Sequence, residues 1–177
     1  MLVLFRHGQC EHNIVNWISC GLDSKSELTE LGRQVVKESA LELKDYIGDR
    51  KFKVYASPLL RTKQTAMIIC NVLGIDSAEI ICDERIKEAQ YGSYNEGPVP
   101  NLPYNVYDMD KFVEQGSESY ADINKRLGEF MKDKFDGSNV IVVSHALPIR
   151  EMHKTLTGIQ DKVKVGKYFI VKWNLKQ

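Results

Sequence analysis

The sequence lacks three features that would assign the protein to a membrane, to an export route or to nucleic acid. No apolar stretch approaches the roughly 20 residues that a membrane-spanning helix needs. The first apolar run starts at residue 1, so we expect no signal peptide. The 24 basic side chains (Lys and Arg) balance the 24 acidic ones, so no excess charge favours nucleic acid or an anionic membrane as a partner.

The sequence also lacks closely spaced cysteines. Cys10, Cys20, Cys70 and Cys82 are spread along the chain without a CxxC motif. This spacing predicts reduced thiols in a cytoplasmic protein and not a disulfide framework. No cysteine has an arginine six positions later and no GxxxxGK[ST] motif is present, so we expect neither a cysteine-phosphatase loop nor a nucleotide-binding P-loop.

Apolar runs alternate with amphipathic segments along the chain. The predicted strands are 1–6, 53–56, 79–82, 139–143 and 167–173. The predicted helices are 11–17, 29–46, 57–73, 117–135 and 148–156. In the helix 29–46 Thr29 is the expected N-cap, and the apolar stripe is formed by Leu31, Val35, Val36, Leu41 and Leu43. In the helix 57–73 Ser57 is the expected N-cap and Pro58 the first helical residue. This alternation predicts an α/β fold with three layers, α/β/α, around a mostly parallel central sheet.

The chain length fits one domain, which we expect to span residues 1–177. Within it, residues 92–116 hold three of the five prolines (Pro98, Pro100 and Pro103) and form the least regular part. This segment is a candidate lid or specificity loop.

Five side chains suited to chemistry follow the predicted strands. Arg6 and His7 follow the first strand, Arg61 the second, Glu88 the third and His145 the fourth. Because the carboxyl ends of parallel strands meet at one edge of an open sheet, we expect one shared site there. Guanidinium groups bind phosphate oxygens, an imidazole can act as a nucleophile, and a carboxylic acid can protonate a leaving alkoxide. The set suits phosphoryl transfer through a phosphohistidine.

Six sequence motifs occur in order along the chain. They are Arg6-His7-Gly8-Gln9-Cys10-Glu11-His12-Asn13, Leu28-Thr29-Glu30-Leu31-Gly32, Ser57-Pro58-Leu59-Leu60-Arg61-Thr62-Lys63-Gln64-Thr65-Ala66, Ile86-Lys87-Glu88-Ala89-Gln90-Tyr91-Gly92 followed by Glu96-Gly97, Gly116-Ser117-Glu118-Ser119, and Val142-Val143-Ser144-His145. Together they resemble the histidine phosphatase superfamily, also called the phosphoglycerate mutase-like family, over nearly the whole chain. Cys10 replaces the threonine that is usual in the first motif.

The resemblance implies a role for each residue at the site. His7 would be the nucleophile, and Glu88 the general acid and then the base that activates water. Arg6, Arg61 and His145 would hold the phosphoryl oxygens. The implied substrate-binding residues are Arg6, Asn13, Gly21, Arg61, His145 and Ala146, of which Ala146 stands where the family commonly has glycine. No metal and no cofactor is expected, because cations of the protein take their place.

Several other side chains leave alternatives open. Glu84 could supply the acid in place of Glu88, and Glu11 is a third carboxylate near the first motif. His12 and His153 are interpreted as structural or surface residues. The tyrosines of the irregular part either line a substrate pocket or belong to the core; they are Tyr91, Tyr94, Tyr104 and Tyr107.

Chain length and charge favour hydrolysis over mutase transfer. Mutases of the family are longer and carry an insertion with extra basic residues, whereas Lys111 is the only basic residue within 89–124. We therefore predict a phosphomonoesterase acting on a small phosphorylated substrate or a phosphoprotein. A phosphoglycerate mutase is the first alternative, and a catalytically weak scaffold for phospho-ligands or partner proteins is the second. The sequence leaves a homodimer open.

Overall fold

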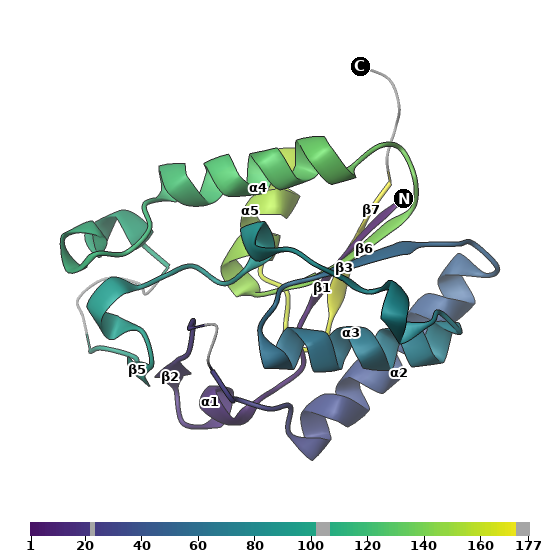
Figure 1. Cartoon of the computed structure of the whole chain (residues 1–177), viewed down its shortest axis with the longest axis horizontal. Coiled ribbons are helices and arrows are strands. Elements are labelled where there is room, and N and C mark those ends of the chain that lie inside the picture. The colour runs from purple at the N-terminus through teal and green to yellow at the C-terminus, as the bar shows by residue number, and fades with distance from the viewer. Residues whose placement is uncertain (22–23, 102–106, 173–177) are drawn as a thin grey trace.

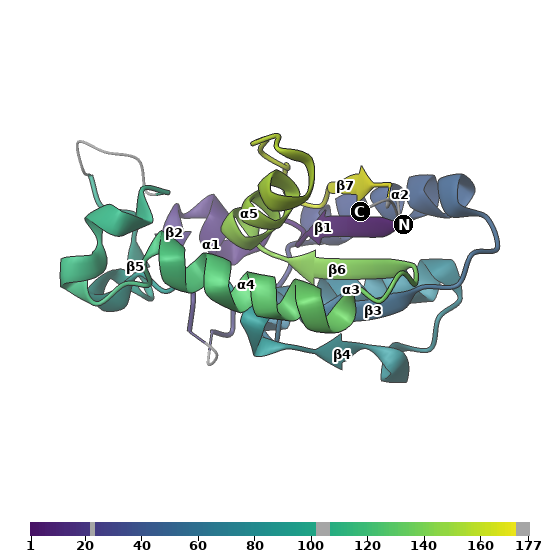
Figure 2. The same cartoon turned by 90° about the horizontal axis from the view of Figure 1, so that it is seen from above.

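The computed structural model describes residues 1–21, 24–101 and 107–172 and has a five-stranded sheet at its centre (Figure 1). The strand order is β4 (Ile81–Cys82), β3 (Lys53–Ala56), β6 (Val140–Ser144), β1 (Leu2–Arg6) and β7 (Tyr168–Val171), which Figure 2 shows spread out from one edge to the other. The first four strands run parallel, and β7 pairs antiparallel with β1. The predicted mostly parallel sheet is confirmed.

Helices cover both faces of this sheet, which confirms the three-layer α/β/α architecture. Figure 1 shows α4 (Tyr120–Lys134) and α5 (Ala146–Thr157) above the strands, and α2 (Glu30–Ile47) and α3 (Leu60–Leu73) below them. Side chains of β1 alternate between the two layers: Leu2 and Leu4 pack with α4 and α5, while Val3 and Phe5 pack with α2 and α3. Both faces of β1 are therefore buried, as its continuous apolar sequence predicts.

Strand register brings the two histidine motifs together. Arg6 at the end of β1 lies opposite Ser144 at the end of β6. The His7 N–H continues the ladder and donates to the Ser144 carbonyl at 3.0 Å, and the Ser57 N–H donates to Val143 across the β3–β6 pair at 3.0 Å. Residues that follow three adjacent strands, His7, Ser57 and His145, thus begin at the same edge of the sheet.

The predicted start of α3 is wrong. The helix begins at Leu60, with Leu59 in the N-cap position and no side-chain cap, and not at Ser57. The Ser57 hydroxyl is instead bonded to the ring of His145 at 2.8 Å. The hydroxyl still accepts from the nearby Leu59 N–H, at 3.5 Å, but its shorter hydrogen bond joins it to a residue far along the chain.

Two other helices differ from the prediction in detail. α5 begins at Ala146, directly after His145, so Pro148 lies inside its first turn, where its missing N–H breaks no helical bond. In α2 the Thr29 hydroxyl accepts the predicted capping bond from Gly32 at 2.9 Å. The predicted stripe is only partly right, because Leu31 and Leu41 are exposed while Val36, Ala40, Leu43 and Ile47 are buried.

The remaining elements are short. α1 (Glu11–Ile14) ends before the predicted residue 17, because Trp17–Ile18 form a strand, β2, that pairs with β5 (Gly97–Pro98) in a second, two-stranded sheet. The predicted strand 79–82 keeps only two residues in β4, and the last strand ends at Val171, with residue 173 of the prediction outside the described residues. Within the described part of 92–116 the chain forms single 3₁₀ turns and β5. None of the helices described is long and apolar enough to cross a bilayer.

Candidate active site

His7 presents one ring nitrogen as a nucleophile. The ring is 2 % exposed, and its Nδ1 lies 2.7 Å from the Gly8 carbonyl oxygen. A carbonyl can only accept, so Nδ1 carries the proton and Nε2 keeps its lone pair. Burial, followed by the charges of Arg61 and Arg6, holds the pKa of His7 well below its usual 6.5. The imidazole is therefore neutral at neutral pH, as nucleophilic attack requires.

Arg61 is a buried cation whose hydrogen-bonding groups are only partly used. Its side chain comes from the first turn of α3, and the residue is 1 % exposed. Nη2 donates to the Ser19 carbonyl at 2.8 Å and to Nδ1 of His145 at 3.2 Å. Nε and Nη1 are buried without a partner among the described residues. Unpaired buried donors on a cation are costly, and an anion with several oxygens would satisfy them.

Arg6 adds a second guanidinium to the same site. Its Nη1 donates to the Val163 carbonyl at 2.9 Å, which fixes the side chain at the end of β1. Its Nε is also buried without a partner in the described part of the chain. Two arginines with unused donors therefore line the same cavity as His7.

His145 is placed differently from the sequence expectation. It occupies the N-cap position of α5, fully buried, with its ring centroid 5.2 Å from that of His7. Because an arginine N–H can only donate, Nδ1 accepts from Arg61, and Nε2 donates to the Ser57 hydroxyl at 2.8 Å. Both ring nitrogens are thus in use, and His145 contacts Arg61 instead of opening into the cavity. Ser57, which sequence reasoning treated as a helix cap, belongs to the site.

Glu88 supplies the carboxyl group. It follows the 3₁₀ turn Glu84–Ile86, and its Oε1 accepts from the Ala89 N–H at 3.0 Å. Burial raises its pKa above the usual 4.5, against the opposing pull of the Ala89 N–H and Arg61. The raised pKa favours the protonated form that a general acid needs. The alternatives Glu84 and Glu11 are exposed and do not line the cavity that Glu88 lines.

A cavity of about 240 Å³ joins these groups. Six predicted site residues line it: Arg6, His7, Asn13, Arg61, Glu88 and Ala146. Asn13 accepts from the Cys10 thiol through Oδ1 at 2.9 Å, and the cysteine thus holds this amide at the cavity wall. Gly21 is not part of the lining, because its N–H donates to the Glu96 carboxylate at 2.7 Å. The implied substrate contact of Gly21 has no support in this geometry.

Sequence reasoning missed part of the cavity wall. His12 lines the cavity and is 9 % exposed, with Nδ1 2.8 Å from the Ser26 hydroxyl. Burial lowers its pKa to about 3. Trp17, Ser19 and Cys20 line the cavity too. Their signal is position: His12 lies inside the first motif, and Trp17, Ser19 and Cys20 lie between that motif and Gly21.

The tyrosines fit both interpretations. Tyr91 and Tyr107 line the cavity and also pack with the core, Tyr94 packs against the core, and Tyr104 lies outside the described residues. His153 is structural: it stacks on Phe169 with centroids 4.1 Å apart. Within the described ranges, no group of three His, Cys, Asp or Glu side chains is arranged to hold a metal ion.

Comparison with known proteins identifies the family. The profile of the histidine phosphatase superfamily (branch 1) matches residues 2–164. The chain belongs to the histidine phosphatase superfamily. Phosphoserine phosphatase 1 of Hydrogenobacter thermophilus is 32 % identical to it over 170 residues, which cover 89 % of this chain and 76 % of the relative. A 2,3-bisphosphoglycerate-dependent phosphoglycerate mutase of Sinorhizobium fredii is 30 % identical, with 85 % and 76 % covered.

Solved structures of the superfamily share the fold. A mycobacterial glucosyl-3-phosphoglycerate phosphatase superposes with a TM-score of 0.74 at 19 % identity, covering 94 % of this chain and 87 % of that one. A structure called mycobacterial hydrolase 1 gives a TM-score of 0.75 at 20 % identity, with 94 % and 86 % covered. Both the family and the fold class inferred from the sequence motifs are thereby confirmed. The phosphohistidine mechanism is general to the histidine phosphatase superfamily, and the phosphatase relatives support a hydrolytic function.

Proposed function

We propose that this protein is a phosphomonoesterase that hydrolyses a phosphate ester through a phosphohistidine on His7. One observation carries the proposal. The buried guanidinium of Arg61 has two nitrogens without partners in the described structure, and it lines the same cavity as the neutral, unprotonated Nε2 of His7. This arrangement supports binding of a tetrahedral anion beside a nucleophile.

The first step transfers the phosphoryl group to the enzyme. Nε2 of His7 attacks phosphorus, and the bond from phosphorus to the ester oxygen breaks. Arg6 and Arg61 bind the non-bridging oxygens, on which charge accumulates in the transition state. The carboxyl group of Glu88 gives its proton to the departing oxygen, so that an alcohol leaves and Glu88 becomes a carboxylate.

The second step returns the enzyme to its starting state. The Glu88 carboxylate takes a proton from water while the water oxygen bonds to phosphorus. The bond from phosphorus to Nε2 breaks, inorganic phosphate is formed, and Glu88 is protonated again. Because burial raises the pKa of Glu88, the group regains its proton readily. Each turnover consumes one ester and one water.

Mutase transfer is the second candidate, because basic groups approach the cavity from a part of the chain outside residues 89–124. Arg150 and Lys162 lie 5.2 Å and 5.6 Å from the ring centroid of Tyr107. Arg150 is already paired with Glu151 at 3.1 Å, so of the two only Lys162 lacks a carboxylate partner in the described structure. One such cation offers little compensation for a second phosphate, and this favours hydrolysis.

The test is release of phosphate from p-nitrophenyl phosphate, phosphoserine and 3-phosphoglycerate without added metal, beside a coupled mutase assay. Hydrolysis that disappears in His7→Ala would support the proposal. Mutase activity without net phosphate release would replace it with the second candidate. If neither occurs while phosphate still binds, the protein is a phospho-ligand scaffold.

The proposal also includes a cellular location and a binding partner for the enzyme. We propose a cytoplasmic location, which the four unbonded cysteines support, since that compartment keeps thiols reduced. The proposed partner is a small phosphorylated substrate or a phosphoprotein. Fractionation of cells that express the chain tests the location, and the substrate panel tests the partner.

A further inference from the structure

The segment that carries Glu88 has no helix or sheet to hold it after the turn Glu84–Ile86. Irregular backbone in a protein interior still needs partners for its carbonyl groups. Side chains supply them here for four consecutive residues. Arg126 of α4 donates through Nη1 to the carbonyls of Arg85 (2.6 Å) and Lys87 (2.9 Å) and through Nη2 to that of Glu88 (3.5 Å). The Ser144 hydroxyl donates to the Ile86 carbonyl at 2.6 Å.

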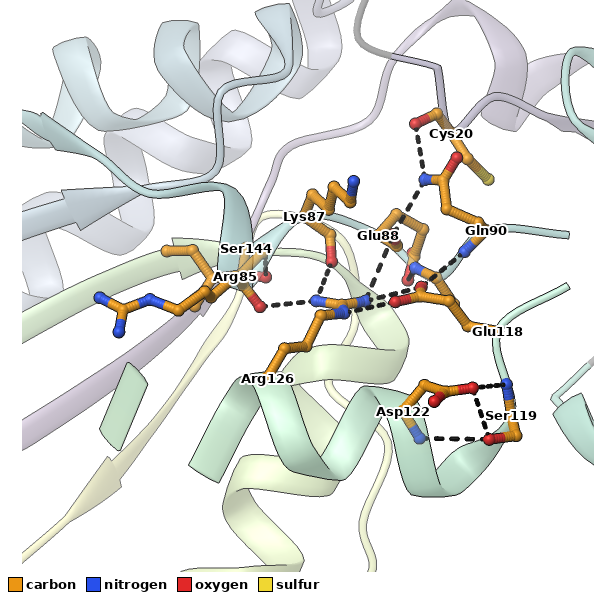
Figure 3. Close-up of polar contacts among 12 residues, drawn as sticks. Cys20, Arg85, Lys87, Glu88, Gln90, Glu118, Ser119, Asp122, Arg126 and Ser144 are labelled. Atoms are coloured by element: carbon orange, nitrogen blue, oxygen red, sulfur yellow. Dashed lines mark hydrogen bonds and ion pairs between the residues drawn. The ribbon is translucent and has the colours of Figure 1, made fainter. Parts of the chain in front are cut away.

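Figure 3 shows Arg126 reaching from α4 into this segment, with Glu118 on its other side. Nε and Nη2 of Arg126 bond to the two carboxylate oxygens of Glu118 at 2.7 Å and 3.1 Å. The side chains of Arg126 and Glu118 are 13 % and 19 % exposed, so water competes little for these bonds. A bidentate pair of this kind fixes the plane of the guanidinium, and hence the direction of every N–H that it offers.

Glu118 also holds the far end of the same segment. Its Oε2 accepts from the Gln90 N–H at 2.9 Å, and its own N–H donates to the Gln90 carbonyl at 3.0 Å. Glu118 lies one residue before Ser119, which caps α4, so the start of the helix sets its position. The side-chain amide of Gln90 donates to the carbonyl of Cys20 at 3.1 Å (Figure 3), and Cys20 lines the cavity.

We propose that Arg126, oriented by Glu118, is a positioning residue that holds the backbone of residues 85–90 so that the Glu88 carboxyl faces the leaving oxygen. Arg126 does not line the cavity, and it touches Glu88 only at the backbone carbonyl. It acts on catalysis through Glu88. A displacement of about 1 Å in a catalytic group can cost about 100-fold in rate. The inference rests on the proposed function of Glu88 as general acid.

The experiment compares two substrates that differ in their need for an acid. Release of an alcohol from β-glycerophosphate requires protonation, whereas p-nitrophenolate leaves without it. In Arg126→Met we expect kcat/KM for β-glycerophosphate to fall by about 100-fold and that for p-nitrophenyl phosphate by less than about 5-fold. The ratio kcat/KM reports transfer to His7 and excludes the later water step, in which Glu88 serves both substrates alike. The dissociation constant of inorganic phosphate stays within about twofold, because Arg6 and Arg61 are untouched. Arg126→Lys keeps the charge but cannot bridge the carbonyls and the carboxylate together, so it restores little.

Two further variants keep the inference falsifiable if Arg126→Met folds poorly. Glu118→Gln breaks one side of the bidentate pair and should show the same substrate selectivity in weaker form. Lys125→Met removes a neighbouring exposed charge of α4 and should change neither rate. The double variant Glu88→Gln/Arg126→Met should be no slower than Glu88→Gln on β-glycerophosphate, because a residue acting only through Glu88 has nothing left to position.

Each outcome has one interpretation. Equal losses on both substrates, additive losses in the double variant, or an unchanged β-glycerophosphate rate would overturn the positioning role while the phosphatase function stands. If Glu88→Gln itself shows no preference between the substrates, the acid assignment fails and the inference fails with it. If the wild-type protein releases no phosphate from either ester, the proposed function is what has failed.

Discussion

Arg61 and His145 are joined by a hydrogen bond of 3.2 Å from Nη2 to Nδ1, in a region where neither side chain is more than 1 % exposed. Burial and the Arg61 charge hold the pKa of His145 well below 6.5. A neutral His145 can accept from the guanidinium and pass its own N–H to Ser57. Hydrogen bonds thus link Ser57 to His145 and His145 to Arg61, and Arg61 is the member that lines the cavity. The orientation of Arg61 depends on the Ser57 hydroxyl at the other end of this series.

The first prediction concerns Ser57. Replacing it with alanine leaves the His145 Nε2–H buried without an acceptor, so Ser57→Ala should lower the free energy of unfolding by about 2 kcal/mol and weaken phosphate binding through Arg61. The matched control is Ser39→Ala, because Ser39 is also fully buried but its hydroxyl has no partner in the described structure. Urea denaturation of both variants measures the difference. If both variants lose the same free energy of unfolding, the hydrogen bond between Ser57 and His145 adds no stability.

The second prediction concerns the buried charge of Arg61. Arg61→Met removes a buried cation with two unpartnered donors, and this relief should outweigh the loss of its bonds to the Ser19 carbonyl and the His145 ring. The free energy of unfolding without ligand should therefore rise by about 1–3 kcal/mol, while hydrolysis is abolished. Thermal denaturation with and without phosphate tests this. The wild type should gain about 2.7 kcal/mol at a phosphate concentration 100 times its Kd, and Arg61→Met nothing. A variant that phosphate still stabilises would locate the anion site elsewhere.

The third prediction is the pH dependence of kcat. His7 must be unprotonated, and its pKa is lowered, so the acid limb lies below pH 6.5. Glu88 must be protonated to release an alcohol, and its pKa is raised, so the rate falls as pH rises through a value above 4.5. Glu88→Gln should lose the alkaline limb for β-glycerophosphate and keep the acid limb. Measuring kcat at saturating substrate limits the influence of substrate ionisation, and an alkaline limb that persists in Glu88→Gln would assign it to another group.

The fourth prediction uses two glycines in helices. A Cβ on Gly32 would collide with the carbonyl oxygen of Gln9, in the loop that follows His7. Gly32→Ala should therefore lower the free energy of unfolding by about 3 kcal/mol and reduce kcat. Gly128→Ala is the control: beyond its own helix and chain neighbours, no atom of the described residues lies within 4 Å of a Cβ there, and helix propensity should raise stability by about 1 kcal/mol. Chemical denaturation measures the free energy of unfolding of both variants, and similar values for the two would argue against the collision at Gly32.

Local pattern in the sequence was enough to predict the sheet and the centre of the site. Continuous apolar runs marked β1, β3 and β6 because strands buried on both faces need them. Parallel strands end at one edge, so His7, Arg61 and Glu88 were expected together, and they line one cavity. The expected direct role of His145 in phosphate binding remains a prediction, since its ring contacts Arg61.

Where the sequence-based predictions and the structure differ, the cause is contact between residues far apart in the chain. Ser57 was assigned to a helix cap because the sequence shows only the local partner, whereas the fold offers it the ring of His145, 88 residues away. The Gly21 N–H likewise has an acceptor in Glu96, 75 residues away, and its contact with substrate stays a prediction. Lys162 was missed because its closeness to Tyr107 depends on how α5 packs.

The pairing of Trp17 with Pro98 adds a second, smaller sheet beside the main one, and residues near both sheets line the cavity. The arginines and His7 stand at the edge of the main sheet, while Trp17 and Val99 come from the segments joined by the small sheet. Substitutions at Trp17 or Val99 leave β1, β3 and β6 untouched. The shape of the cavity can therefore be changed through the small sheet while Arg6, His7 and Arg61 keep their places.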